Sequence, residues 1–288
     1  MTPTLRGALR LGLLTAVLVV VPAIPAAADP ARPTNYRSTV VTIDPPTRGV
    51  RVDVVGGDSF LRLRTESGRT VVVLGYDNEP YLRFNTDASV EENLRSPAVL
   101  LNTARYGTLA PQPAEVDPKA EPRWRRVGGG AEYAWHDHRV HWMGKAKPPQ
   151  LGTAATGKVD DWTVPLLVDG TPVTVQGTLE LTAAPTPLPW LGLAVIFTAT
   201  LYLLARRFSP IATLGAAMLF AGAFAGAVAV AGQLGLPDVA GRRPSLYIIP
   251  DIVALCGLGA VILRQKPSAI ALLAGAALTF PLWIVLNA

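Results

Sequence analysis

The stretch WHDHRVHWM, residues 135–143, holds all three histidines of the chain: His136, His138 and His141. If this stretch forms a strand, side chains two residues apart leave the same face about 6.6–7 Å from each other. That spacing suits His136 and His138 converging on one metal ion, whereas His141 joins them only if a bulge or turn intervenes. Met143 follows and is the one methionine of the predicted exported domain. The stretch therefore predicts a metal site with these four side chains as candidate ligands.

The ligand types in this stretch point to a transition metal. Imidazole binds both zinc and copper, and the thioether of Met143 is a soft ligand that favours copper. Asp137 lies between the first two histidines and could accept a hydrogen bond from one of their rings, as carboxylates beside metal-bound histidines do. We therefore expect copper or zinc as the cofactor.

The same residues are compatible with two other roles. On a straight strand Asp137, Arg139 and His141 share a face, where they could pair with one another as a polar latch. Trp135 and Trp142 could then pack against the sheet or at a membrane boundary. A third interpretation is a proton sensor, because clustered histidines titrate near neutral pH and repel one another once charged. The sequence leaves all three interpretations open.

Enzymatic chemistry has less support in the sequence. Asp137 and His136 could assist a serine nucleophile such as Ser59 or Ser96. The chain carries neither a Gly-x-Ser-x-Gly motif nor a phosphate-binding loop, however, and the GGDS run at 56–59 is typical of a β-turn. We therefore do not expect an enzyme.

Charge is distributed unevenly along the chain. Residues 29–187 have an ordinary soluble composition, with 18 Lys/Arg and 19 Asp/Glu. Residues 188–288 hold only 6 bases and 2 acids, Asp238 and Asp251, in an otherwise apolar sequence. The formal net charge of +5 therefore comes from outside the soluble part. It indicates membrane topology rather than a surface for nucleic acid.

The N-terminus predicts a secretory signal peptide over residues 1–28. Arg6 and Arg10 precede the apolar run LGLLTAVLVVV, and small residues before Asp29 suit cleavage at that point. The alternative is an uncleaved anchor, but the apolar run is shorter than the roughly 20 residues that a spanning helix needs.

Four apolar stretches follow a Pro-rich linker at 182–189 and predict a four-helix transmembrane unit over 190–288. If the signal exports residue 29 onward, the basic links after the first and third stretches lie in the cytoplasm, in agreement with the positive-inside rule. We therefore expect a multi-pass protein of the cell membrane with its N-terminal domain outside the cytoplasm. Gly222 and Gly226 stand four apart and suit close helix packing, within this unit or between copies. The stretches are 188–205, 211–234, 246–263 and 269–287.

Residues 29–181 predict an all-β extracytoplasmic domain, an immunoglobulin- or cupredoxin-like sandwich. Short runs rich in Val and Leu recur with glycines between them. In FLRLRT, Leu61 and Leu63 face one way and the arginines face the other. Asp169–Gly170 predicts a hairpin turn, and a short helix capped by Ser96 is expected over 96–107. The predicted strands are 37–43, 50–56, 60–65, 70–76, 81–84, 162–168 and 173–181.

Several motifs together resemble a group of exported actinobacterial membrane proteins with a WHDHRxHWM motif. They are GGDSFLRL, YLRF, RSPAVLLN, WHDHRVHWM and the hairpin WTVPLLVDGTPVTVQGTLEL, and they span most of residues 30–190. The order of signal, β-sandwich and C-terminal helices is also similar to that of periplasmic copper-handling proteins of the CopC and YcnI type. Those proteins carry a metal-binding histidine at the mature N-terminus, where this chain would begin DPARP.

Two functions follow as hypotheses. The first is a membrane-anchored module that binds copper or zinc through its histidine cluster and handles metal in the cell envelope. The alternative is a non-catalytic interaction or scaffold protein in which the His/Asp/Arg stretch is a structural latch. The expected partners are the lipid bilayer and another membrane or envelope protein, and not nucleic acid.

Overall fold

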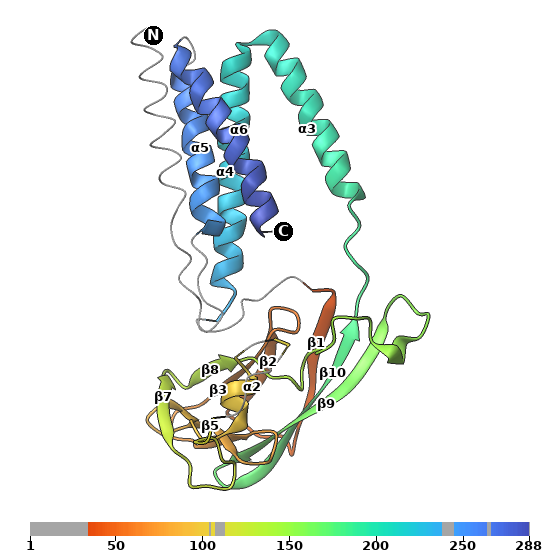
Figure 1. Ribbon diagram of the computed structural model, residues 1–288, viewed down its shortest axis with the longest axis vertical. Coiled ribbons are helices and arrows are strands. Elements are labelled where there is room, and N and C mark those ends of the chain that lie inside the picture. The colour runs from red at the N-terminus through yellow and green to blue at the C-terminus, as the bar shows by residue number, and fades with distance from the viewer. Residues whose placement is uncertain (1–33, 104, 107–112, 238–244, 264–265, 288) are drawn as a thin grey trace. The chain divides into compact units, whose positions relative to one another are not determined.

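The computed structural model describes part of the chain in two compact units, an all-β domain and a set of C-terminal helices (Figure 1). The predicted signal peptide at 1–28 lies outside the described residues. The described residues are 34–103, 105–106, 113–237, 245–263 and 266–287.

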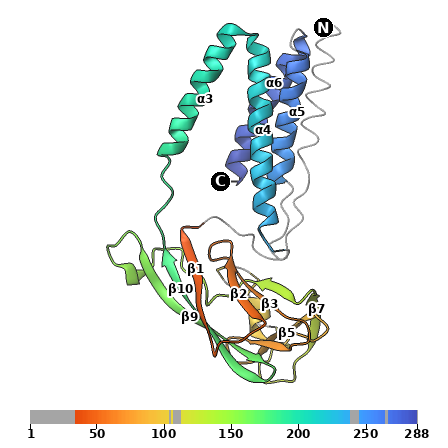
Figure 2. The ribbon, with the colours of Figure 1, turned by 180° about the vertical axis from the view of Figure 1, so that it is seen from behind.

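The β domain consists of two antiparallel sheets. Its strands are β1 (Tyr36–Asp44), β2 (Val50–Val55), β3 (Phe60–Thr65), β4 (Val71–Leu74), β5 (Pro80–Phe84), β6 (Val90–Asn93), β7 (Trp124–Gly128), β8 (Glu132–Trp135), β9 (Gly157–Val168) and β10 (Thr171–Leu181). The larger sheet has the order β1-β10-β9-β4-β5-β6-β7, and the smaller sheet has the order β2-β3-β8. Strands β1, β10 and β9 lie side by side in Figure 2. Buried side chains of both sheets belong to one hydrophobic core, which confirms the predicted all-β domain and shows that its sheets are antiparallel.

Strand β3 shows how the sequence pattern places side chains. Leu61 and Leu63 are buried in the core. Arg62 and Arg64 leave the opposite face, where both bind Asp53 of the neighbouring strand β2 at N–O distances of 2.6 and 2.9 Å. The period of two therefore separates a buried apolar face from a charged outer face, as predicted.

The predicted hairpin is formed by β9 and β10. Asp169 and Gly170 both have positive φ, at 49° and 81°, and they connect the paired residues Val168 and Thr171. Such a two-residue turn needs left-handed backbone at both positions, which Asp-Gly supplies at low cost. The first strand begins at Gly157 rather than near Trp162, so the hairpin is longer than the sequence indicates.

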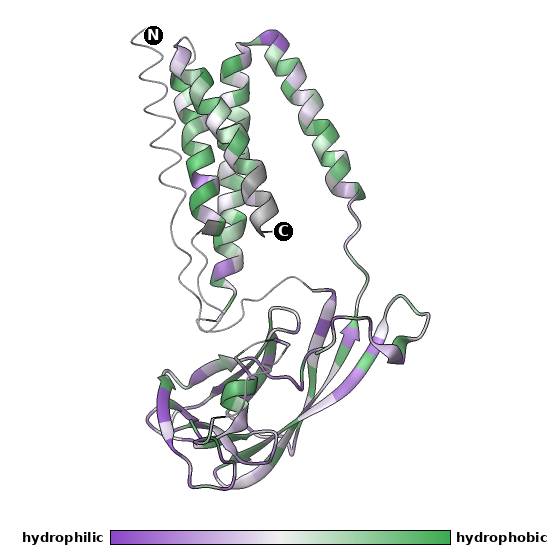
Figure 3. Ribbon diagram, viewed as in Figure 1, coloured by the Kyte–Doolittle hydropathy of each residue, from purple (hydrophilic) through white to green (hydrophobic). Residues whose placement is uncertain are grey.

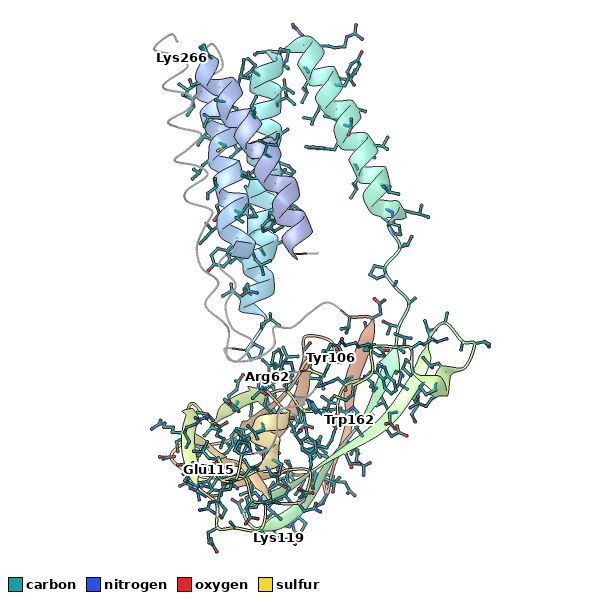
Figure 4. The ribbon with its side chains drawn as sticks, viewed as in Figure 1. Arg62, Tyr106, Glu115, Lys119, Trp162 and Lys266 are labelled. Atoms are coloured by element: carbon teal, nitrogen blue, oxygen red, sulfur yellow. The ribbon has the colours of Figure 1, made fainter. Side chains whose placement is uncertain are left out.

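Glycine at position 177 of β10 is required by its neighbours. Trp162, labelled on β9 in Figure 4, lies against it: a Cβ at Gly177 would stand 2.1 Å from the indole and 2.4 Å from the carbonyl oxygen of Thr39. We expect Gly177→Ala to lower the free energy of unfolding by about 1–3 kcal/mol through overpacking. Urea unfolding followed by tryptophan fluorescence measures this loss.

The matched control is Gly129→Ala in the same domain. The nearest atom to a Cβ there lies 3.5 Å away and the backbone is not left-handed. This variant is expected to stay within about 0.5 kcal/mol of wild type. Equal unfolding midpoints for the two variants would contradict the packing argument.

The helix predicted over 96–107 is shorter in the structure. Helix α2 spans Pro97–Leu101, and the Oγ atom of Ser96 accepts a hydrogen bond from the Ala98 N–H at its start, as predicted. Asn102 caps its C-terminal end, and the side-chain oxygen of Asn102 accepts a hydrogen bond from the Tyr76 hydroxyl. A 3₁₀ turn, η1, spans Pro149–Leu151.

The C-terminal unit consists of helices that begin and end close to the four predicted apolar stretches. Most of their residues are hydrophobic, as the colouring by hydropathy shows (Figure 3). Among the described residues, α4 is the one helix long and apolar enough to cross a bilayer, with a mean hydropathy of 2.0. Apolar segments at Leu246–Ile262 and Pro267–Phe280 are shorter. The helices are α3 (Leu188–Arg207), α4 (Pro210–Leu234), α5 (Ser245–Ile262) and α6 (Pro267–Asn287).

The small residues of α4 allow close contact with α5. A Cβ at Gly222 would lie 2.5 Å from the Pro250 carbonyl oxygen and 2.6 Å from the Ala254 nitrogen. At Gly226 it would lie 2.6 Å from an oxygen of Asp251. The predicted small-residue face is therefore used for packing within the helical unit.

Candidate functional site

The histidine stretch leaves the sheet through a turn. Strand β8 pairs with β3, with Trp135 opposite Leu61, and ends at Trp135. The Val140 N–H then donates to the Asp137 carbonyl oxygen at 3.1 Å. The histidine stretch is therefore not a straight strand, and the turn brings His141 back towards the residues before it.

The turn gathers the three imidazoles. The ring centroids of His138 and His141 are 5.3 Å apart and those of His136 and His141 are 6.2 Å apart. His136 packs at 4.3 Å on the ring of Phe60, the first residue of β3. His136 and His141 are each 3% exposed, and His138 is half-buried. Met143 is also half-buried.

Asp137 and Arg139, two of the three residues of the polar-latch interpretation, form an ion pair, although not on a strand face. The Nε and Nη2 atoms of Arg139 donate to the fully buried Asp137 carboxylate at 2.8 and 2.7 Å. Trp135 Nε1–H donates to the same carboxylate at 2.9 Å. Burial alone would raise the pKa of Asp137, but the guanidinium and these donors outweigh it and hold that pKa below its usual value. His141 takes no part in this pair.

Arg139 also ties the turn to strand β4 and the residues after it. Its Nη1 donates to the Leu74 carbonyl oxygen at 3.1 Å, and its guanidinium lies 5.0 Å from the ring centroid of Tyr76. The Asp137–Arg139 pair therefore fixes the backbone of the turn to the large sheet.

His141 has a defined tautomer. Its Nε2 lies 2.8 Å from the carbonyl oxygen of Arg105, which can only accept, so Nε2 carries the proton. Burial, together with the positive charge of Arg105 and the neighbouring histidines, lowers the pKa of His141 to about 4. The neutral ring therefore has its lone pair on Nδ1. That atom is buried, and no residue in the described part of the chain hydrogen-bonds to it.

Residues far away in the sequence also position His138. The backbone N–H of His138 donates to the hydroxyl oxygen of Tyr76 at 2.9 Å. That hydroxyl in turn donates to the Asn102 side-chain oxygen at 2.5 Å. Burial raises the pKa of Tyr76, with a further contribution from the charge of Asp137, so the phenol stays protonated and able to donate. Tyr76, Asn102 and Arg105 belong to the site, but no local pattern in the sequence marks them.

The ring spacing can be compared with that around one metal ion. With a metal–nitrogen distance of about 2.0–2.1 Å and a ring centroid about 1 Å beyond the nitrogen, two imidazoles at a tetrahedral angle have centroids about 5 Å apart. His138 and His141, at 5.3 Å, match this spacing. His136, at 6.2 Å from His141, stands about 1 Å too far. Accordingly, no three His, Cys, Asp or Glu side chains within the described ranges are arranged to hold an ion.

The two serines considered as nucleophiles have structural hydrogen bonds. Ser59 Oγ–H donates to the Gly56 carbonyl oxygen at 2.9 Å within the turn before β3. Ser96 Oγ–H donates to the buried carboxylate of Glu79 while Ser96 caps α2. Both side chains are fully buried.

Comparisons with protein-family models, with curated proteins and with solved structures find no match for this chain.

Proposed function

We propose that the β domain binds a transition-metal ion, copper or zinc, through its histidine cluster. The observation that carries the proposal is His141, whose Nε2–H is held by a backbone carbonyl while its Nδ1 lone pair is buried without a hydrogen bond. A metal-bound histidine almost always donates its other ring N–H to a carbonyl or carboxylate in this way. A neutral imidazole at physiological pH is also the form that binds metal.

His138 and His141 form the core of the proposed site. Their ring spacing suits one ion, and the half-buried His138 gives an approach from solvent. His136 completes a three-histidine site if it moves about 1 Å, the excess of its ring spacing over the tetrahedral value. Met143 is the soft fourth ligand that would distinguish copper from zinc.

We further propose that the protein is a multi-pass protein of the cell membrane with the β domain exported. The support is the apolar character of α3 to α6 and the basic residues Arg206 and Arg207 at the end of α3. The immunoglobulin- or cupredoxin-like sandwich and the kinship with exported actinobacterial membrane proteins belong to the same proposal. The protein would then handle metal at the outer face of the membrane.

A second candidate is a non-catalytic scaffold protein of the envelope with a protein partner. The observation that favours it is the Asp137–Arg139 pair, because this latch gives the histidine stretch a structural role that needs no ligand. The two functions differ in one measurable property, since only the first requires stoichiometric metal.

The test is metal binding by the full chain in detergent, purified without a histidine tag. We expect about one Cu²⁺ or Zn²⁺ per chain by elemental analysis after dialysis, and loss of that ion in a His138→Ala/His141→Ala variant. Replacing Met143 with Leu should weaken Cu⁺ but not Zn²⁺ if the thioether is a ligand. An Asp161→Ala variant on the exposed face of β9 is the matched control and should bind as wild type does. Absence of stoichiometric metal, or equal binding by the double-histidine variant, contradicts the proposal and favours the scaffold.

A further inference from the structure

A second buried ion pair lies next to the histidine cluster. Asp58 is fully buried and Arg105 is 6% exposed. The guanidinium donates through Nη1 and Nη2 to the two carboxylate oxygens at 3.2 and 2.5 Å. Thr34 Oγ1–H donates to the same carboxylate at 2.9 Å. This two-bond geometry fixes the direction of the arginine side chain as well as its distance.

The pair joins two segments that are far apart in the sequence. Asp58 lies in the turn between β2 and β3, where its N–H donates to the Gly56 carbonyl oxygen at 3.0 Å. This turn leads directly into Phe60, the residue that packs on His136. Arg105 follows α2. The ion pair therefore holds the segment after α2 against the same turn that supports the first histidine.

Arg105 has two separate functions in this arrangement. Its side chain binds Asp58, and its main-chain carbonyl oxygen accepts the Nε2–H of His141. We infer that the Asp58–Arg105 ion pair is a positioning device, which holds the Arg105 carbonyl where it fixes the tautomer and orientation of His141. Asp58 and Arg105 are thus positioning residues rather than ligands. The expected effect of the ion pair on metal affinity rests on the proposed function, whereas its expected effect on the His141 tautomer does not.

A role in positioning is consistent with the chemistry of the pair. A buried ion pair is weak support for stability, because the cost of removing both charges from water can exceed their attraction. Here the fully buried Asp58 pairs with Arg105, and the backbone carbonyl oxygen of Arg105 in turn contacts His141. Supporting groups of this kind matter for affinity, and their removal weakens metal binding by about 10- to 100-fold.

The experiment compares Asp58→Asn with wild type in the full chain, using ¹⁵N-histidine NMR without metal and Zn²⁺ affinity with metal. The chain has only three histidines, so single His→Gln variants assign the signals. In wild type we expect one tautomer at His141, with the proton on Nε2. In Asp58→Asn we expect a mixture of both tautomers and Zn²⁺ binding weaker by about 10- to 100-fold.

The matched control is Glu92→Gln, which removes another buried acid from an ion pair, with Arg125, between β6 and β7. It should change neither the tautomer nor the affinity. An unchanged tautomer in Asp58→Asn, or equal effects of both substitutions, overturns the inference. If Asp58→Asn does not fold, Arg105→Lys keeps the charge but loses the two-bond geometry and is judged by the same readouts. If Asp58→Asn changes the tautomer of His141 but the wild-type protein binds no Zn²⁺, the positioning role is supported and the proposed metal-binding function is contradicted.

Discussion

Replacement of Asp137 by Asn is expected to lower the free energy of unfolding of the β domain by about 3–5 kcal/mol. The side chain is fully buried and accepts hydrogen bonds from Arg139 and Trp135. Asn keeps the shape but not the charge, so the Arg139 guanidinium would remain largely buried without its counterion. Breaking a buried pair by removing one partner costs more than the pair contributes, because the remaining charge stays desolvated.

Urea unfolding of the full chain, followed by tryptophan fluorescence, measures this loss. A double variant, Asp137→Asn with Arg139→Met, should recover part of it because no unpaired charge remains. The control is Asp161→Asn, since Asp161 belongs to an exposed pair with Lys158 and its loss should cost less than about 1 kcal/mol. If Asp137→Asn unfolds at the same urea concentration as Asp161→Asn, the latch does not stabilise the turn.

The fold of the β domain could be predicted where its signals are local. Leu61 and Leu63 alternate with arginines, and a strand is the conformation that separates the two kinds of side chain. The Asp169–Gly170 pair specifies a turn through its backbone preferences alone. Strands β6 and β7 were not predicted, because VEEN and WRRVG lack apolar alternation. The two strands are joined instead by cross-strand pairs such as Arg125 with the buried Glu92.

The candidate site could be predicted only in part. Residue types and spacing marked His136 and His138, and the need for a bend before His141 was foreseen. The bend itself comes from the Val140–Asp137 hydrogen bond and from Arg139 reaching the sheet. The period of two cannot indicate it, since periodicity assumes a regular strand.

The groups that orient the histidines were not predictable. Tyr76 is 62 positions before His138, and Arg105 is 36 positions before His141. Such contacts depend on how the sheets and α2 pack, and a carbonyl acceptor carries no side-chain signature at all. The positions of the helices in the C-terminal unit were easier to predict, because long apolar stretches between charged links specify a helix by their composition.

The contribution of His141 to the stability of the metal-free protein is expected to fall by about 3 kcal/mol as the pH drops from about 6.5 to about 4. The pKa of His141 is lowered from 6.5 to about 4 in the folded state, by burial first and then by the charges of Arg105, His138 and His136. Between these values the unfolded chain binds a proton at His141 that the folded chain does not. The His141 contribution to stability therefore decreases with decreasing pH through this window and is constant above it. A difference of about 2.5 pH units corresponds to about 3 kcal/mol.

The measurement is the urea midpoint of the full chain at a series of pH values, with a chelator present so that metal does not contribute. Carboxylates also titrate in the acid half of this range, so the informative quantity is the difference between wild type and His141→Gln. Glutamine keeps an N–H that can donate to the Arg105 carbonyl but has no titrating group. The stability of the His141→Gln variant should therefore depend less on pH than that of wild type between pH about 6.5 and about 5, where few carboxylates titrate. Parallel pH profiles for the two proteins would show that His141 is not the buried neutral imidazole on which the ligand proposal depends.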